Sequence, residues 1–171
     1  MSISRHNVLP FFLAMVAMLL LVGCAHVISK EVLKEVDTNV TFVQVSKAPD
    51  AYKGKTVLFG GAIIEAKNLP DKTLLVVLQR PLNRQGQPAA GDISEGRFII
   101  QTQGFLDPAI YSPGRKITVA GKVVGKDMRP LGEIQYTYPI IEKRELYLWP
   151  EEKSASTEPK VHLGVGIGIG L

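Results

Sequence analysis

Between residues 56 and 149, clusters of Gly, Pro, Asn and Asp divide the chain into short segments that are apolar or that alternate apolar and polar residues. Short segments separated by such turn-forming residues are typical of β-strands joined by turns. The segment 115–124 alternates most regularly, because Ile117, Val119 and Val123 share one face of an extended chain. We predict five strands, at residues 56–67, 73–79, 97–103, 115–124 and 139–149.

Gly60 and Gly61 lie inside the first predicted strand, where glycine marks a bulge or a sharp bend. Bent strands suit a barrel, and closure of a barrel removes the exposed edges of an open sheet. We therefore predict an all-β fold at residues 41–150: a small five- to six-stranded antiparallel barrel, OB-like. A two-sheet β-sandwich is the alternative.

A short helical turn is predicted before the first strand. Thr41 and Gln44 match a capping box, Phe42 and Val45 fall on one helical face, and Pro49 ends the helix. A short strand is the alternative for this segment, since Val43 and Val45 are β-branched and alternate. Residues 24–40 read as a short helix or a tether, and we expect a partly ordered tether.

The N-terminus has the pattern of a secreted bacterial lipoprotein. A basic start is followed by fifteen mostly apolar residues at 8–22, which is short for a membrane span and suits a signal peptide at 1–23. The run ends in the lipobox Leu21-Val22-Gly23-Cys24, where small residues fit the signal peptidase and the thiol accepts the acyl group. A signal peptide or signal anchor with a chance cysteine is the alternative. Ala25 in place of Asp favours the outer membrane over inner-membrane retention.

Catalytic patterns are missing from the predicted barrel. The three histidines, His6, His26 and His162, all lie outside it, and the chain has one cysteine, so neither a Ser-His-Asp nor a multi-thiolate metal site is expected there. An enzyme would have to use acids of the predicted loops, namely Asp71, Asp92, Glu95, Asp107 and Glu133. We expect a non-enzymatic protein without metal or cofactor. A formal net charge of +4 is too small to indicate nucleic acid.

Two surface features suggest partners in the envelope. Aromatic rings can line a binding face, and the candidates are Tyr136, Tyr138, Tyr147 and Trp149; the alternative is that these rings cap the barrel and cover its seam. A basic strip would suit lipopolysaccharide phosphates, and its members would be Arg97, Lys116, Lys122, Lys143 and Arg144. The Gly-rich segment 151–171 reads as a flexible tail, with an edge-adding strand as the alternative.

Several blocks of the chain, in order, resemble the Slp family of outer-membrane lipoproteins. They include Gly60-Gly61-Ala62-Ile63, residues 68–81 (NLPDKTLLVVLQRP), Gly104-Phe105-Leu106-Asp107-Pro108 and Glu145-Leu146-Tyr147-Leu148-Trp149. The resemblance implies a lipoprotein attached to the outer membrane through acylated Cys24, its domain in the periplasm, and a role in starvation or stress. The alternative is a carbohydrate- or lipid-binding barrel that uses the Tyr/Trp face. The candidate partners are an envelope protein, peptidoglycan or lipopolysaccharide.

Overall fold

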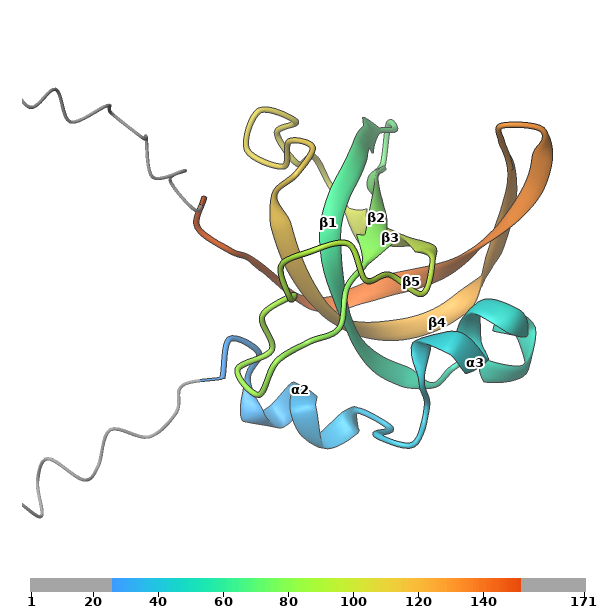
Figure 1. Ribbon diagram of the computed structural model, residues 1–171. Coiled ribbons are helices and arrows are strands. Elements are labelled where there is room, and N and C mark those ends of the chain that lie inside the picture. Colours follow the sequence, from blue (N-terminus) through green and yellow to red (C-terminus); the bar gives the residue numbers. More distant parts are fainter. Residues whose placement is uncertain (1–25, 152–171) are drawn as a thin grey trace, which may run out of the picture.

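Five strands pair into a closed barrel in the computed structural model, which describes residues 26–151 (Figure 1). The order around the barrel is β1-β2-β3-β5-β4. This confirms the prediction of a five- to six-stranded, OB-like barrel, and the number of strands is five. The strands are β1 (Thr56–Asn68), β2 (Lys72–Gln79), β3 (Arg97–Gln103), β4 (Lys116–Leu131) and β5 (Ile134–Leu148).

One pair of neighbouring strands departs from the predicted antiparallel arrangement. β3 and β5 run parallel, with Ile99 opposite Ile140 and Gln101 opposite Glu142. The other four pairs are antiparallel. A parallel pair needs a connection that crosses from one end of the barrel to the other, and here the chain makes it through the 104–114 loop and β4.

β1 changes partners at the glycine pair. Its first half is paired with β4 and its second half with β2, and Gly61 is opposite both Ile117 and Gln79. The register shift of β1 lies further on, between Ile63 and Glu65. The glycines therefore mark the bend at which β1 passes from one neighbour to the other, and the bulge is separate from them.

The barrel interior holds the inward-facing residues of all five strands and two residues of a helix. Phe42 and Val45 of α3 (Phe42–Lys47) are buried in the same cluster as Phe59 and Phe98. The ring of Phe42 meets both of those phenylalanines edge to face, at centroid distances of 5.3 and 5.8 Å. α3 therefore closes one end of the barrel.

The predicted capping box begins this helix. The Thr41 side chain accepts a hydrogen bond from the Gln44 amide, and the Gln44 side chain accepts one from the Thr41 amide. A 3₁₀ helix, η2 (Pro49–Tyr52), follows after Ala48. The helical prediction is confirmed, and Pro49 is the residue at which the α-helix gives way.

The expectation of a tether is wrong for residues 26–40. Ile28 is 2% exposed, and the amide and hydroxyl of Ser29 donate to the carboxylate of Glu145 at 2.7–3.1 Å. Ser29 also caps a short helix, α2 (Lys30–Glu35). Contacts with a strand more than a hundred residues away hold this segment, which we call the N-terminal arm (residues 26–41), against the barrel.

Residues 125–136, a polar hairpin region between the fourth and fifth predicted strands, form a hairpin, but β4 and β5 extend further into it than predicted. Their pairing extends from Lys126 opposite Pro139 to Leu131 opposite Ile134. Figure 1 shows this hairpin projecting from the barrel on the side away from the two ends of the described chain. Both of its faces reach solvent, so polar residues are compatible with strand structure here.

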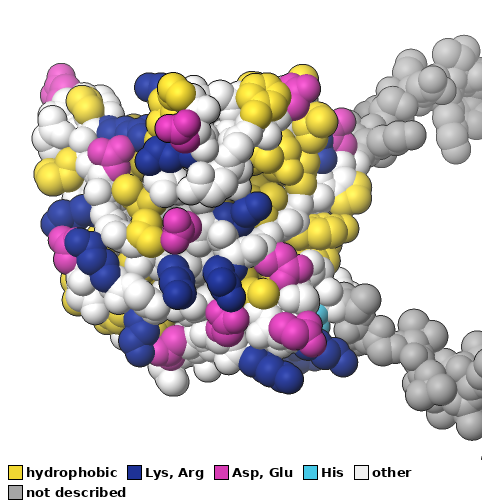
Figure 2. Space-filling view, turned by 180° about the vertical axis from the view of Figure 1, so that it is seen from behind, with side chains coloured by type: hydrophobic (Ala, Val, Ile, Leu, Met, Phe, Trp, Pro, Cys, Tyr) yellow, Lys and Arg dark blue, Asp and Glu magenta, His cyan; other side chains and the backbone are white. Residues whose placement is uncertain are grey.

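The predicted basic strip carries both signs of charge. Arg144 Nη2 lies 3.0 Å from Glu35 Oε1, and Lys122 is opposite Glu142 in the sheet. Figure 2 shows Lys and Arg interspersed with Asp and Glu over the face of the molecule seen from behind. Lipopolysaccharide binding through these residues stays a prediction.

Candidate binding pocket

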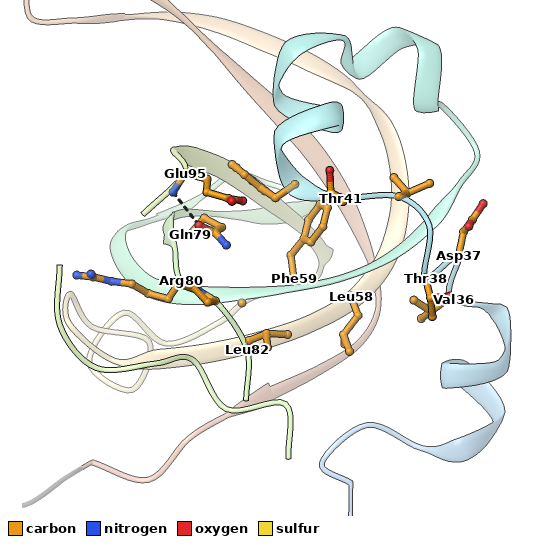
Figure 3. A pocket seen from close by; sticks show the side chains of 14 residues that line it. Val36, Asp37, Thr38, Thr41, Leu58, Phe59, Gln79, Arg80, Leu82 and Glu95 are labelled. Carbon is orange, nitrogen blue, oxygen red and sulfur yellow. Dashed lines mark hydrogen bonds between the residues drawn. The ribbon is translucent and has the colours of Figure 1, made fainter. Parts of the chain in front are cut away.

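A pocket of about 380 Å³ opens between the N-terminal arm and the barrel (Figure 3). Four segments supply its lining: the arm and the start of α3, the first half of β1, the end of β2 with the residues that follow it, and Glu95. Arm residues 36–41 therefore complete a site that the barrel alone would leave as an open surface.

The pocket walls are mainly apolar. Phe59 comes from the barrel core, and Leu58 is its neighbour in β1; the two alternate between the inner and outer faces of the strand. Together with the arm, α3 and the residues after β2, they line the pocket with seven apolar side chains, Val36, Val40, Phe42, Leu58, Phe59, Pro81 and Leu82.

Polar groups at the pocket are fixed by hydrogen bonds within the chain. The Gln79 Oε1 atom accepts from the Glu95 amide at 2.9 Å, and Arg80 Nη1 donates to the Ile93 carbonyl oxygen at 3.3 Å. The Arg80 amide donates to the Gly60 carbonyl oxygen at 2.9 Å. These bonds connect the 80–96 loop to the barrel and hold the polar side of the pocket in place.

Asp37 contributes a carboxylate that stays ionised. Lys55 Nζ donates to its Oδ2 atom at 2.9 Å, and the Asn39 amide donates to Oδ1 at 3.2 Å. Both hydrogen bonds favour the charged form, so they lower the pKa of Asp37 below its usual value. An acid or base for catalysis near neutral pH needs the opposite shift. The lining contains neither histidine nor cysteine.

The acids proposed for the enzyme alternative are not gathered at this pocket. Glu95 lines it, whereas Asp71, Asp92, Asp107 and Glu133 do not. Asp107 instead accepts a hydrogen bond from the Ala109 amide at 2.9 Å and shapes its own loop. Within residues 26–151, no three His, Cys, Asp or Glu side chains are grouped as metal ligands.

The four predicted aromatic residues form two pairs near the two ends of β5. Tyr136 and Tyr138 meet edge to face at 4.8 Å, and the Arg97 amide donates to the Tyr136 hydroxyl at 2.9 Å. Tyr147 and Trp149 meet edge to face at 4.9 Å. The sequence suggested one aromatic face, but the pairs lie toward opposite ends of β5 and form two separate sites. A binding role for either pair stays a prediction.

Other sequence predictions concern residues outside the described range. Leu21, Val22, Gly23 and Cys24 precede it, and nearly all of the predicted tail at 151–171 follows it. None of the helices at 26–151 has the length and hydrophobicity required to cross a bilayer.

The pocket itself had no sequence signal. Its lining comes from residues 36 to 95, and each contributing segment reads locally as strand, turn or arm. Only the packing of the N-terminal arm on the barrel brings them together. The arm was expected to be a tether, so its residues were not candidates.

Comparison with known proteins identifies the family. The family model described as outer membrane lipoprotein Slp family matches residues 21–165, which is most of the chain. The chain belongs to this family. The match includes the lipobox, the arm and the whole barrel, so the resemblance seen in the sequence is confirmed.

Relatives of this Slp-family chain occur in two bacteria. An uncharacterized lipoprotein, YeaY, of Escherichia coli K12 is 29% identical, covering 85% of this chain and 75% of the relative. The outer membrane protein Slp of the same organism is 27% identical, covering 66% and 60%. An uncharacterized protein of Haemophilus influenzae is 32% identical, covering 56% and 52%.

Solved structures give only distant matches. A small single-stranded DNA-binding protein from Streptomyces coelicolor is 13% identical with a TM-score of 0.34, covering 54% of this chain and 92% of that one. Pot1pC of Schizosaccharomyces pombe bound to single-stranded DNA is 11% identical with a TM-score of 0.32, covering 58% and 81%. At this level of similarity, nothing about function carries over.

Proposed function

We propose that this Slp-family protein is a non-enzymatic binding module of the cell envelope, anchored through acylated Cys24, with its barrel in the periplasm. The observation that carries the binding role is the pocket between the N-terminal arm and the barrel. Pockets for small molecules combine apolar walls with a few fixed polar groups, and this one has that composition.

The lining favours a small ligand with an apolar body and an uncharged polar end. Seven apolar side chains would surround the body, while Gln79 offers the NH₂ group of its side-chain amide. The charged side chains of the lining are Asp37, Glu95 and Arg80, which leave no excess of positive charge. Strongly anionic ligands therefore fit less well than a lipid fragment or another neutral amphipathic molecule.

A fluorescence titration with the uncharged probe N-phenyl-1-naphthylamine tests this pocket. The wild-type protein should bind the probe, and Leu58→Glu and Leu82→Glu should each weaken binding about tenfold, because each places a carboxylate at an apolar wall. Val124→Glu is the matched control, since Val124 is exposed on β4 and is not part of the lining. Failure of the wild type to bind, or equal binding by all four proteins, would overturn the pocket proposal.

The anchor is tested by the intact mass of the protein extracted from membranes. A mass equal to residues 24–171 plus acyl groups supports acylation at Cys24. Cys24→Ser should then leave an uncleaved precursor. Normal processing and membrane retention of this variant would contradict the anchor. A role in starvation or stress rests on the family resemblance and would be tested by the phenotype of a deletion strain.

A further inference from the structure

The loop between β3 and β4, residues 104–114, displays apolar side chains from a fixed backbone. Phe105 is 71% exposed and Ile110 is 52% exposed. Between them, the Leu106 amide donates to Thr73 Oγ1 and its carbonyl oxygen accepts from Asn68 Nδ2, both at 3.1 Å. Large apolar side chains held in water by an ordered loop indicate an interaction surface.

Arg115 connects this loop to the aromatic pair at the end of β5. Its guanidinium donates to the Ile110 carbonyl oxygen at 3.0 Å and to the Trp149 carbonyl oxygen at 2.8 Å. The Tyr147 and Trp149 rings, both partly exposed, meet edge to face. Arg115 therefore joins the backbone of the loop to that of the chain at the end of β5. We call the exposed or partly exposed side chains of these two segments, Phe105, Ile110, Tyr147 and Trp149, the apolar face.

The contacts continue from the apolar face to the N-terminal arm. The Trp149 indole donates to Thr118 Oγ1 at 2.9 Å, and the Thr118 hydroxyl donates to the Gly86 carbonyl oxygen at 2.6 Å. Gly86 in turn lies beside Val27, because a Cβ added to it would be 3.5 Å from Val27 Cγ2. The apolar face thus adjoins the point at which the chain leaves toward Cys24.

The figures show the same arrangement from two sides. In Figure 1, both ends of the described chain and the 104–114 loop, coloured gold, lie on the left of the barrel, opposite the β4–β5 hairpin. In Figure 2, hydrophobic side chains gather at the upper right, beside the place where one of the grey segments leaves.

The distance from Cys24 to the barrel is short. Ile28 is packed on the barrel and is four residues from Cys24, so the link spans at most about 14 Å. An acyl group on Cys24 would hold this side of the domain against the bilayer. Tyrosine and tryptophan favour the membrane–water interface, where the ring is apolar on one side and hydrated on the other.

We propose that the apolar face is a membrane-contact surface that rests on the phospholipid headgroups and inserts Phe105 and Ile110 among the upper acyl carbons. The proposal builds on the acylation of Cys24 proposed above. It fixes the orientation of the barrel, with the apolar face toward the lipid and the β4–β5 hairpin away from it.

Trp149 is the single tryptophan of the chain and reports directly on this contact. The acylated protein would be reconstituted into phosphatidylethanolamine–phosphatidylglycerol vesicles that contain lipid brominated near the headgroup end of its acyl chains. Trp149 emission should be quenched by the bromolipid and protected from acrylamide. The double variant Phe105→Ser/Ile110→Ser should lower bromolipid quenching by about twofold, because it removes the inserted apolar area.

Met128→Ser/Ile134→Ser is the matched control, since these residues of the β4–β5 hairpin are 57% and 61% exposed. Its quenching should equal that of the wild type. Vesicle flotation is measured on every sample to separate the two proposals. Flotation without quenching, or equal quenching by both double variants, overturns the membrane-contact surface and leaves the anchor intact. Loss of flotation by the wild type overturns the anchor. If Trp149 is protected from acrylamide only after an envelope protein is added, the apolar face binds a protein partner, and the membrane-contact proposal is overturned.

Discussion

At Gly61 the backbones of β1 and β2 approach so closely that an added Cβ would meet the carbonyl oxygen of Leu78. This backbone oxygen belongs to the β-ladder and cannot move without breaking the pairing at the bend of β1. We expect Gly61→Ala to lower the free energy of unfolding by about 3 kcal/mol. Urea denaturation monitored by circular dichroism measures the change.

Comparing Gly104→Ala with Gly61→Ala distinguishes the cost of a left-handed backbone from the cost of a steric clash. Gly104 has a φ of 76°, yet no atom lies within 4 Å of the position its Cβ would take. Alanine in the left-handed region costs about 1 kcal/mol, so this variant should be clearly more stable than Gly61→Ala. Equal costs for the two variants would contradict the close-approach explanation of Gly61.

Asp50 makes a local contribution to stability that depends on pH. Lys126 and Lys53 each hold its carboxylate at 2.8 Å, and their hydrogen bonds lower its pKa from 3.8 to about 2. A lowered folded-state pKa stabilises the fold above the unfolded value, and the stabilisation is lost as the pH falls through the folded value. Asp50→Asn should therefore unfold at a lower temperature than the wild type at pH 7, and the difference should shrink between about pH 4 and about pH 2.

Thermal unfolding at several pH values checks this prediction. Asp92→Asn serves as the control, because Asp92 is an exposed loop residue. Its unfolding temperature should follow the wild type across the same range. A difference between Asp50→Asn and the wild type that stays constant down to pH 2 would show that the carboxylate charge has no part in the effect.

At the scale of the elements, α3 covers one end of the barrel with Phe42 and Val45, and Thr41 is the residue that caps the start of this helix. Removing the side-chain cap of a helix costs about 1 kcal/mol, so Thr41→Ala should lower the free energy of unfolding by that amount. Thr38→Ala is the control, because Thr38 is exposed in the same arm and caps no helix. Equal stability of the two variants in urea would show that the capping box contributes nothing measurable.

The bounds of the strands and helices show which of them could be predicted from the sequence. β3 has the predicted bounds, Arg97–Gln103, because turn residues flank it on both sides. β4 and β5 are longer than predicted, because Gly125, Pro130 and Gly132 were expected to end the strands at a polar hairpin region, although the paired strands accommodate them. A short helix at 24–40 was one of two interpretations of the sequence, but the packing of α2 could not be predicted, because the bonds of Ser29 to Glu145 depend on the completed barrel.

At the scale of the whole molecule, the lengths of the arm and of its link to Cys24 decide how the domain meets the membrane. The arm is part of the pocket and is packed on the barrel through Ile28, so the free link is limited to the few residues before it. In the native protein, two effects keep the domain near the bilayer: the short link to Cys24 and the affinity of the apolar face for lipid. A longer link would remove the first effect, so the second could be measured alone.

A twelve-residue Gly/Ser insertion between Ala25 and His26 would allow the domain to move about 20 Å from the bilayer. Vesicle flotation should be unchanged, because the acyl anchor is intact. Quenching of Trp149 by bromolipid should persist in the lengthened protein and disappear when Phe105→Ser/Ile110→Ser is added, since confinement no longer compensates for the lost apolar contacts. If the insertion alone abolishes quenching, the short link accounts for the proximity and the apolar face has no measurable affinity for lipid.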